Sequence, residues 1–226
     1  MLSVDNSNNL EDDESTSENG SDESFKDIAA LDSPKEWTYT MRRSMQEVAP
    51  RLYLGPYSSA SRQKLQDLQE RGITHIVCVR QDIEAHFIRP NFPDKFEYLV
   101  LNIADTATEN IIQHFRTVKA FIDKGLHSGG RVLVHGNAGI SRSAALVLAY
   151  VMETYSLTPT RAYALVQQRR FCINPNEGFM AQLREYEPIY QAQNQLKNDP
   201  LTSREESKRK CHDIERPDDR AVLMDS

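Results

Sequence analysis

The chain has 226 residues, a formal net charge of −6 and 39% hydrophobic residues, fewer than the roughly 45–50% usual for a compact domain. Length and composition therefore predict one domain with unfolded tails and leave little room for two full domains. No run approaches the ~18 apolar residues of a membrane span, the start lacks the pattern of a signal peptide, and three cysteines without CxxC spacing argue against a disulfide scaffold or zinc site.

The charge divides the chain into three parts. Residues 1–36 carry a net charge of −9 and almost nothing to bury, so we expect a disordered acidic tail. The expected folded unit is residues 37–195, which is long enough for one sizeable core and has a net charge of +4 over residues 37–190. Residues 196–226 mix both signs of charge, and we expect a second disordered tail.

The first half of the folded unit alternates apolar runs with one helical pattern. A helix is indicated where leucines recur at helical spacing and a glycine follows, and strands are indicated by short apolar runs. The expected strands are 51–55, 73–79 and 96–102, and the expected helix is 61–72.

The second half has one more strand and four helical patterns. Asn110 is expected to cap the first of these helices, and Thr158 with Pro159 to begin the third. The expected helices are 110–124, 141–155, 158–170 and 176–193, and the strand is 131–135. Strands followed by helices predict an α/β fold, with a central, mostly parallel twisted sheet flanked by helices.

The segment 134–143 joins an apolar strand to an apolar helix, and it is the part of the sequence that indicates chemistry. Its small residues allow the loop to curl so that successive backbone N–H groups point inward. Such a concavity at a helix N-terminus suits a phosphate dianion. Arg142 enters the first helical turn, where its guanidinium can direct two N–H groups at phosphate oxygens.

This segment resembles the H-C-x-x-G-x-x-R-S motif of cysteine-dependent protein phosphatases. The flanking SRSAALVLAYVME and RRFCINPNEGFMAQL resemble the dual-specificity branch, and the resemblance covers about residues 37–190. One position departs, because Gly136 stands where the family has its nucleophilic cysteine. Four further segments (EWTYTMRR, LYLGPYSSA, GITHIVCVRQDIEAHFIRPNF and VHGNAGISRSAA) resemble a pseudophosphatase of this family that also has glycine there.

The resemblance implies a role for each position of the site. Arg142 matches the transition-state arginine, Ser141 the hydroxyl that assists breakdown of the intermediate, and His135 the residue that lowers the thiol pKa. Asp105 matches the general acid. Gly136 can do none of the work of a thiolate, so the implied site binds phosphate without turnover. The expected phosphate-binding residues are Gly136, Asn137, Ala138, Gly139, Ile140, Ser141 and Arg142.

Each of these residues also has a structural interpretation. Arg142 could pair with an acid at the helix start, and Ser141 could be a helix N-cap. Asp105 could order the segment before helix 110–124, and His135 could be a buried, hydrogen-bonded histidine without present function. Cys172 is favoured as a small buried residue over a substitute nucleophile.

Two further features lie in the tails. The run Lys208–Lys210 could be a nuclear-import patch, but acids flank it, which favours a solvated charge run. Ser21 lies among carboxylates, where acid-directed kinases act, and a phosphorylated Ser21 could dock into the chain's own loop. The alternative, which we favour, is a solubilising tail.

Three functions compete on this sequence: an inactive phosphatase that binds phosphoproteins, a phosphatase with an unorthodox nucleophile, and an interaction protein with a relic pocket. We expect the first. The resemblance implies protein partners phosphorylated on Ser, Thr or Tyr, with MAP kinases among them, and residence in cytoplasm and nucleus. No metal, cofactor, nucleic acid or membrane is expected to bind, and the chain is expected to be a monomer.

Overall fold

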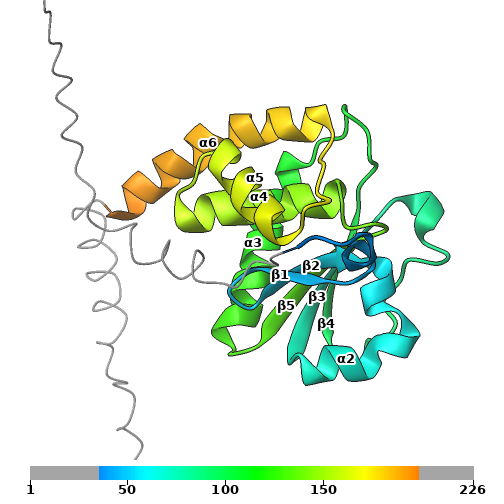
Figure 1. Cartoon of the computed structure of the whole chain (residues 1–226). Helices are drawn as coiled ribbons and strands as arrows, with labels where there is room; N and C mark the ends of the chain where they lie inside the picture. The colour runs from blue at the N-terminus through cyan, green and yellow to red at the C-terminus, as the bar shows by residue number, and fades with distance from the viewer. Residues whose placement is uncertain (1–35, 199–226) are drawn as a thin grey trace, which may run out of the picture.

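The computed structural model describes residues 36–198 and centres on one five-stranded sheet in the order β1-β2-β5-β3-β4 (Figure 1). The strand β1 pairs with β2 antiparallel, and the remaining neighbours are parallel. The strands are β1 Gln46–Ala49, β2 Leu52–Pro56, β3 Ile73–Arg80, β4 Glu97–Asn102 and β5 Arg131–Gly136. The expected α/β class and its four strands are therefore confirmed, and β1 is an additional edge strand.

Alternation along the strands divides the core into two parts. Leu52, Leu54, Val132 and Val134 belong to the large core, which the sheet forms with α3, α4, α5 and α6. The intervening residues, such as Leu133, belong to a smaller core with α2. Side chains of successive strand residues point to opposite faces, so both faces of a strand buried on two sides must be apolar.

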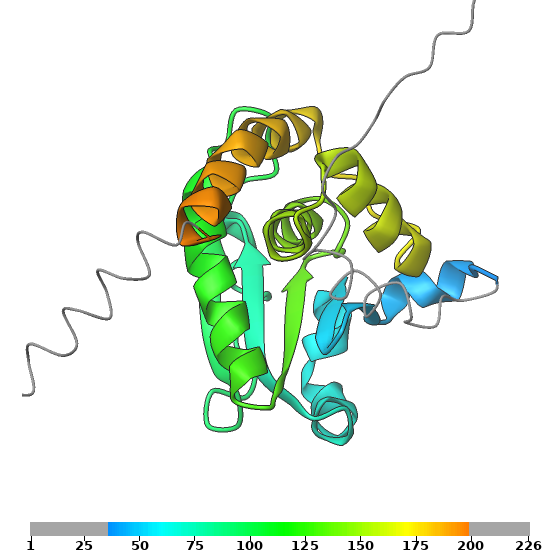
Figure 2. The ribbon, with the colours of Figure 1, turned by 90° about the vertical axis from the view of Figure 1, so that its left-hand side faces the viewer.

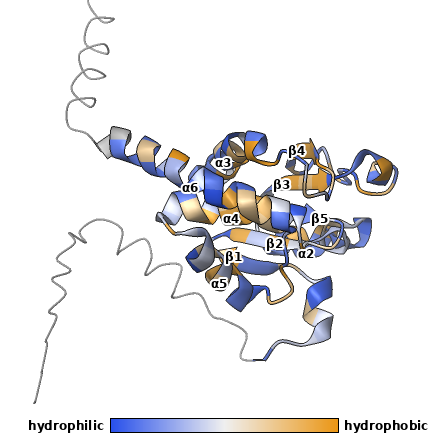
Figure 3. Cartoon of the chain, turned by 90° about the horizontal axis from the view of Figure 1, so that it is seen from above, coloured by the Kyte–Doolittle hydropathy of each residue, from blue (hydrophilic) through white to orange (hydrophobic). Residues whose placement is uncertain are grey.

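The helix α4 lies at the centre of the helical layer. Figure 2 shows it nearly end-on, with α3, α5 and α6 around it, and Figure 3 shows hydrophobic residues concentrated on the central elements. Residues 142–153 of this helix are all buried. The helices are α2 Leu65–Glu70, α3 Ile112–His127, α4 Arg142–Tyr155, α5 Pro159–Arg169 and α6 Glu177–Asn198, with short 3-10 helices η1 Tyr39–Arg43, η2 Tyr57–Ala60, η3 Arg62–Lys64 and η4 Asp82–Glu84.

Of the two predicted helix caps, the one for α3 differs in the structure and the one for α5 agrees. The cap of α3 is Ile111, without a side-chain cap, and Asn110 does not fill that role. Instead Gln182 of α6 accepts hydrogen bonds at its Oε1 from the N–H groups of Ile111 and Ile112, at 2.8 and 3.1 Å. The prediction failed because the partner lies 70 residues away. For α5, Thr158 is the cap as expected, and its Oγ1 accepts from the N–H of Arg161 at 3.4 Å.

Helix lengths also differ. The helix expected over 61–72 is divided into η3 and the six-residue α2, and α6 continues beyond 193 to Asn198. The expectations for Ser21, for Lys208–Lys210 and for most of both tails concern residues outside the described range. Within that range, no helix has the length and apolarity needed to cross a membrane.

Candidate functional site

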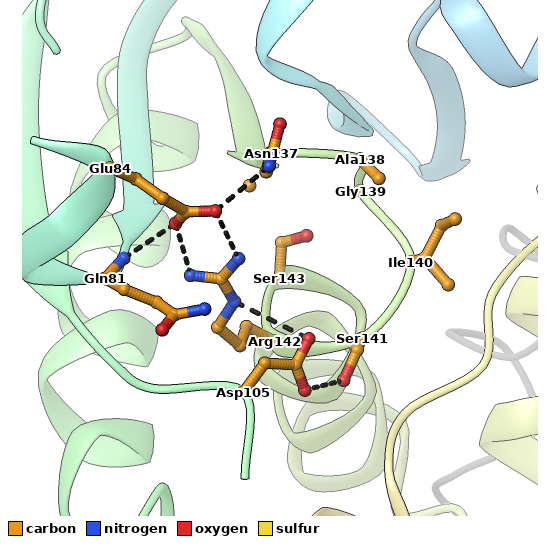
Figure 4. Close-up of a pocket in the computed structure, with 11 residues that line it drawn as sticks. Gln81, Glu84, Asp105, Asn137, Ala138, Gly139, Ile140, Ser141, Arg142 and Ser143 are labelled. Atoms are coloured by element: carbon orange, nitrogen blue, oxygen red, sulfur yellow. Dashed lines mark hydrogen bonds and ion pairs between the residues drawn. The ribbon is translucent and has the colours of Figure 1, made fainter. Parts of the chain in front are cut away.

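A pocket of about 370 Å³ lies at the carboxyl ends of β3 and β5, which is where parallel α/β sheets usually bind ligands (Figure 4). The loop between β5 and α4 forms its floor, the segment after β3 forms one wall, and Asp105 follows β4. The lining residues are Gln81, Glu84, Asp105, Gly136, Asn137, Ala138, Gly139, Ile140, Ser141, Arg142 and Ser143. The structure thus brings all seven expected phosphate-binding residues and Asp105 to one cavity.

Four successive carbonyl groups of the loop are hydrogen-bonded to groups outside the loop. The carbonyl of Asn137 accepts from the N–H of Tyr57 at 3.1 Å, and that of Ile140 accepts from the N–H of Asn174 at 2.9 Å. The carbonyls of Ala138 and Gly139 accept from the guanidinium of Arg170 at 3.0 and 2.9 Å.

The N–H groups of the loop are correspondingly free. Because C=O and N–H point in opposite directions across a trans peptide, outward carbonyls at 137–140 direct the N–H groups of 138–141 the other way. Within residues 36–198, no N–H of residues 137–141 donates a hydrogen bond. Unpaired N–H groups in a concave loop at a helix N-terminus form an anion site.

Arg170 is the residue behind this arrangement, and sequence reasoning did not assign it a role. It is completely buried and also donates to the carbonyls of Ser44 and Arg42, at 2.9 and 3.2 Å, and to Oε1 of Gln46. In the sequence, its partners in the loop are more than 30 residues away. Its partners before and in β1 are more than 120 residues away. The only sequence signal for Arg170 was its place in RRFCINPN, part of a segment that resembles the dual-specificity branch.

Gly139 allows the loop to approach β2. Its φ is +68°, and a Cβ there would lie 2.3 Å from the carbonyl oxygen of Gly55. Both the left-handed backbone and the close approach require glycine. The curl inferred from the small residues of the loop therefore has a specific steric cause at this position.

Arg142 is buried and paired with an acid, as its structural interpretation proposed, but the acid is distant in sequence. Its Nη1 lies 2.7 Å from Oε2 of Glu84, and its Nη2 lies 3.1 Å from Oε1. Nη1 also donates to the carbonyl of Ile103 at 3.2 Å. Glu84 therefore holds the end of the guanidinium.

The side of the guanidinium formed by Nε and Nη2 remains available. The carboxylate nearest to Nε is Asp105, whose Oδ2 is 3.7 Å away, beyond hydrogen-bond distance. A planar guanidinium can bind two oxygens along this second edge while Glu84 occupies the first. The geometry thus accommodates both expected roles of Arg142, pairing with an acid and binding phosphate.

Glu84 was not among the expected site residues. Burial would raise the pKa of its carboxyl, but hydrogen bonds from Arg142, from the N–H of Gln81 and from the side chain of Asn137 hold that pKa below its usual value. The carboxylate is therefore charged at neutral pH. With Asp105 it gives the pocket two negative side chains against the single positive charge of Arg142.

We expect Glu84→Gln to raise the affinity for inorganic phosphate roughly tenfold, because one negative charge leaves the pocket while an amide oxygen still accepts from Arg142. Calorimetric titration with phosphate measures this change. Glu70→Gln, at an exposed position on α2, is the matched control and should leave the affinity unchanged. A loss of affinity in Glu84→Gln alone would show that orientation of Arg142 outweighs repulsion.

Ser141 and Asp105 form one hydrogen-bonded group with Asn176. Oδ1 of Asp105 accepts from Oγ of Ser141 at 2.6 Å and from Nδ2 of Asn176 at 3.0 Å. Ser141 stands at the N-cap position of α4 but makes no side-chain cap bond. Its hydroxyl positions the Asp105 carboxylate at the edge of the pocket.

The hydroxyl nearest to position 136 belongs to Ser143. A Cβ built on Gly136 would lie 3.1 Å from Oγ of Ser143, which is buried without a hydrogen-bond partner among the described residues. The role expected of Ser141, to act beside the nucleophile, therefore fits Ser143 better. The last letter of the H-C-x-x-G-x-x-R-S motif was the signal for it.

His135 is fully buried, and burial lowers its pKa to about 4. Its ring packs 5.8 Å from that of Tyr57, and its Nδ1 has no hydrogen-bond partner among the described residues. The ring is neutral at physiological pH and supplies no positive charge that could lower the pKa of a neighbouring thiol.

His135 should make stability fall in mild acid. Between pH 6.5 and about 4 the unfolded chain binds a proton that the folded chain excludes, so the free energy of unfolding decreases as pH falls, by about 3 kcal/mol at pH 4. Urea unfolding of the wild-type protein and His135→Asn over this range tests the effect. The variant should show a shallower slope, and equal slopes would contradict the assignment.

Neither cysteine of the described residues lines the pocket. Burial raises the pKa of the Cys78 thiol to about 11, which leaves it protonated and unreactive. Cys172 is partly buried and faces a different pocket. Residues 36–198 contain no cluster of three potential metal ligands.

Comparison with known proteins identifies the family. Residues 52–189 match the model of the dual specificity phosphatase catalytic domain. The chain belongs to the dual-specificity phosphatase family. The resemblance drawn from the loop and its flanks, and the fold it implied, are both confirmed.

Among relatives of this family, serine/threonine/tyrosine-interacting protein from mouse is 64% identical over 161 residues, which cover 71% of this chain and 72% of that protein. A crystal structure of the human protein, described as tyrosine phosphatase-like, has a TM-score of 0.65 and covers 66% of this chain and 98% of its own. A Xenopus laevis Slingshot homolog is 40% identical, over 66% of this chain and 20% of that protein.

Proposed function

We propose that the chain is a catalytically inactive phosphatase that binds phosphorylated proteins through residues Gly136–Arg142. One observation supports this most directly: the loop presents unpaired N–H groups and an open edge of Arg142 around a position that has no side chain. The receptor for a phosphate group is complete, and the nucleophile is missing. Loss of a nucleophile typically costs on the order of 10⁶ in turnover.

Glycine at position 136 also removes a repulsion. A thiolate ~4 Å from a phosphate charge would repel it by about 4 kcal/mol per charge pair at an effective dielectric of 20. Against this stands the entropy of ordering a glycine, roughly 0.5–1 kcal/mol. Phosphate binding should survive while turnover is lost, which suits a protein that shields a phosphorylated partner or competes with active phosphatases.

The proposed partners are proteins phosphorylated on serine, threonine or tyrosine, with MAP kinases among them. Relatives named serine/threonine/tyrosine-interacting protein support this partner class. We further propose that the chain acts as a monomeric scaffold, anchor or competitor in the cytoplasm and nucleus. A pull-down with the wild-type protein and with Arg142→Ala separates two kinds of partner. Partners that bind at the loop should be lost with Arg142→Ala, and partners that bind other surfaces should be retained.

The first test is a thermal melt with phosphate or tungstate, because a related mouse dual specificity phosphatase of 29% identity and TM-score 0.60 was crystallised with zinc tungstate. At 100 times Kd, binding should add about 2.7 kcal/mol to the free energy of unfolding. Sodium chloride at the same ionic strength is the control. An unchanged melting temperature would contradict the proposal.

A second candidate function is that of an interaction protein with a relic pocket. The observation in its favour is Glu84, which already occupies one edge of Arg142 and leaves the side chains of the pocket with a net negative charge. On this reading, Glu84 replaces the ligand rather than orienting its receptor. The phosphate titrations discriminate between the two functions. Binding by the wild-type protein supports the phosphate receptor, whereas binding only after Glu84→Gln supports the relic pocket.

A further inference from the structure

A second pocket of about 450 Å³ lies beside the phosphate loop, and we call it the aromatic pocket. Its lining is Trp37, Tyr39, Arg42, Phe171, Cys172, Ile173 and Asn174. Tyr39 and Phe171 are 71% and 61% exposed, and the ring centroids of Trp37 and Phe171 lie 6.3 Å apart. Exposed aromatic rings around a concavity are typical of a binding surface.

The two pockets share their supporting residues. The Arg170 guanidinium donates to Ala138 and Gly139 of the phosphate loop and to Arg42 of the aromatic pocket. Asn174, which lines the aromatic pocket, donates its N–H to the carbonyl of Ile140, which lines the phosphate pocket. In Figure 2 the segment that contains η1 lies next to the C-terminal end of α5, where Arg170 follows.

The lining chemistry defines the ligand. Of the seven lining side chains, all except Arg42 and Asn174 are aromatic, aliphatic or a thiol, and none of the seven is a carboxylate. A large apolar side chain would be removed from water there, and Arg42 adds a positive charge that does not oppose a phosphorylated segment. The exposed Ile83, at 76%, belongs to a different pocket lined by Asp82 and Glu109, where the charges would oppose an anionic segment.

We propose that the aromatic pocket binds a large apolar side chain of the same partner segment whose phosphorylated residue enters the phosphate loop. This inference rests on the proposed function and names its substrate class: phosphorylated segments with an aromatic or large aliphatic residue at one fixed side of the phosphoresidue. The shared contacts of Arg170 and Asn174 set a constant separation between the two bound groups.

Trp37 provides the readout, because it is the single tryptophan of the chain. The probes are twelve-residue phosphoserine and phosphotyrosine peptides of Gly, Ser and Lys, each with one Leu placed in turn at every position around the phosphoresidue. At one or two positions on one side of the phosphoresidue, Leu should raise the affinity of the peptide for the full-length protein about tenfold, or about 1.4 kcal/mol. The same peptides should change the emission of Trp37.

The variant Phe171→Ser should remove the tenfold gain while leaving the affinity for the Leu-free phosphopeptide unchanged. The exposure of Phe171 makes a loss of folding a small concern, which melting temperatures check, and Tyr39→Ser provides a second variant. Ile83→Ser is the matched control at an exposed apolar position outside the aromatic pocket. It should retain the full gain.

The outcomes separate this inference from the proposed function. No binding of any phosphopeptide would contradict the proposed function, and the inference with it. Phosphopeptide binding that is independent of the position of Leu, or unaffected by Phe171→Ser, would overturn the inference alone. Equal binding of unphosphorylated Leu peptides would also overturn it, because the pocket would then act independently of the phosphate loop.

Discussion

Gly136→Cys is expected to create phosphatase activity toward a small aryl phosphate, at least about 10³-fold above the unmodified protein. Loss of a nucleophile typically costs on the order of 10⁶ in turnover, and on the proposed function Gly136 is the position where this chain lacks one. The loop N–H groups and the N-terminus of α4 would lower the pKa of the introduced thiol. Release of the aryl alcohol measures the activity.

The local geometry permits this substitution. A Cβ at position 136 meets Oγ of Ser143 at 3.1 Å and the carbonyl of Val79 at 3.6 Å, so only one hydroxyl has to shift by a few tenths of an ångström. That hydroxyl has no partner among the described residues and could donate to the thiolate. Gly136 is not among the positive-φ glycines, which means that a side chain brings no backbone strain.

Gly136→Ser is the matched control, since it adds an atom of similar reach without the acidity of a thiol, and it should remain inactive. In the Gly136→Cys background, adding Ser143→Ala should slow the chemical step of the new activity more than adding Ser141→Ala does. A folded but inert Gly136→Cys variant would show that the scaffold lacks more than its nucleophile.

Arg142→Lys is expected to weaken phosphopeptide binding by roughly 2–5 kcal/mol, because an ammonium cannot replace the open edge formed by Nε and Nη2. Calorimetry with a phosphopeptide measures the loss. Asp105→Asn should have the opposite effect or none, since it removes a negative charge from the edge of the pocket. Equal affinities for wild type and Arg142→Lys would favour the relic pocket.

This variant also disturbs a buried ion pair, so stability must be measured beside affinity. Lysine leaves part of the Glu84 carboxylate without its hydrogen bonds, and a buried unpaired charge is costly. Melting temperatures of Arg142→Lys and of Arg62→Lys, an exposed control on η3, establish how much of the loss comes from unfolding. Adding Glu84→Gln to Arg142→Lys should recover stability but regain no more than about tenfold of the lost affinity, the part that comes from removing a negative charge.

The sequence predicted those features that depend on local pattern. The strands, the central apolar helix and the loop from Gly136 to Arg142 follow from apolar periodicity, small residues and one motif. What the pattern missed depends on contacts across the fold. Arg170 supports the loop from more than 30 residues away, and Glu84 reaches Arg142 across 58 positions.

The roles of the two serines show the limit of motif transfer. Ser141 and Ser143 flank Arg142 in sequence, but α4 turns them in different directions. Ser141 donates to Asp105, whereas Ser143 lies beneath Gly136. Spacing alone cannot decide which hydroxyl faces the nucleophile position, because the answer depends on where the helix begins.

The most direct test of a phosphate receptor without turnover is one titration of the unmodified full-length protein with a phosphopeptide, in which bound peptide and released inorganic phosphate are both measured. We expect saturable binding with one site per chain and no phosphate release above the protein-free background over many hours. Release of phosphate, or absence of binding at millimolar peptide, would contradict it.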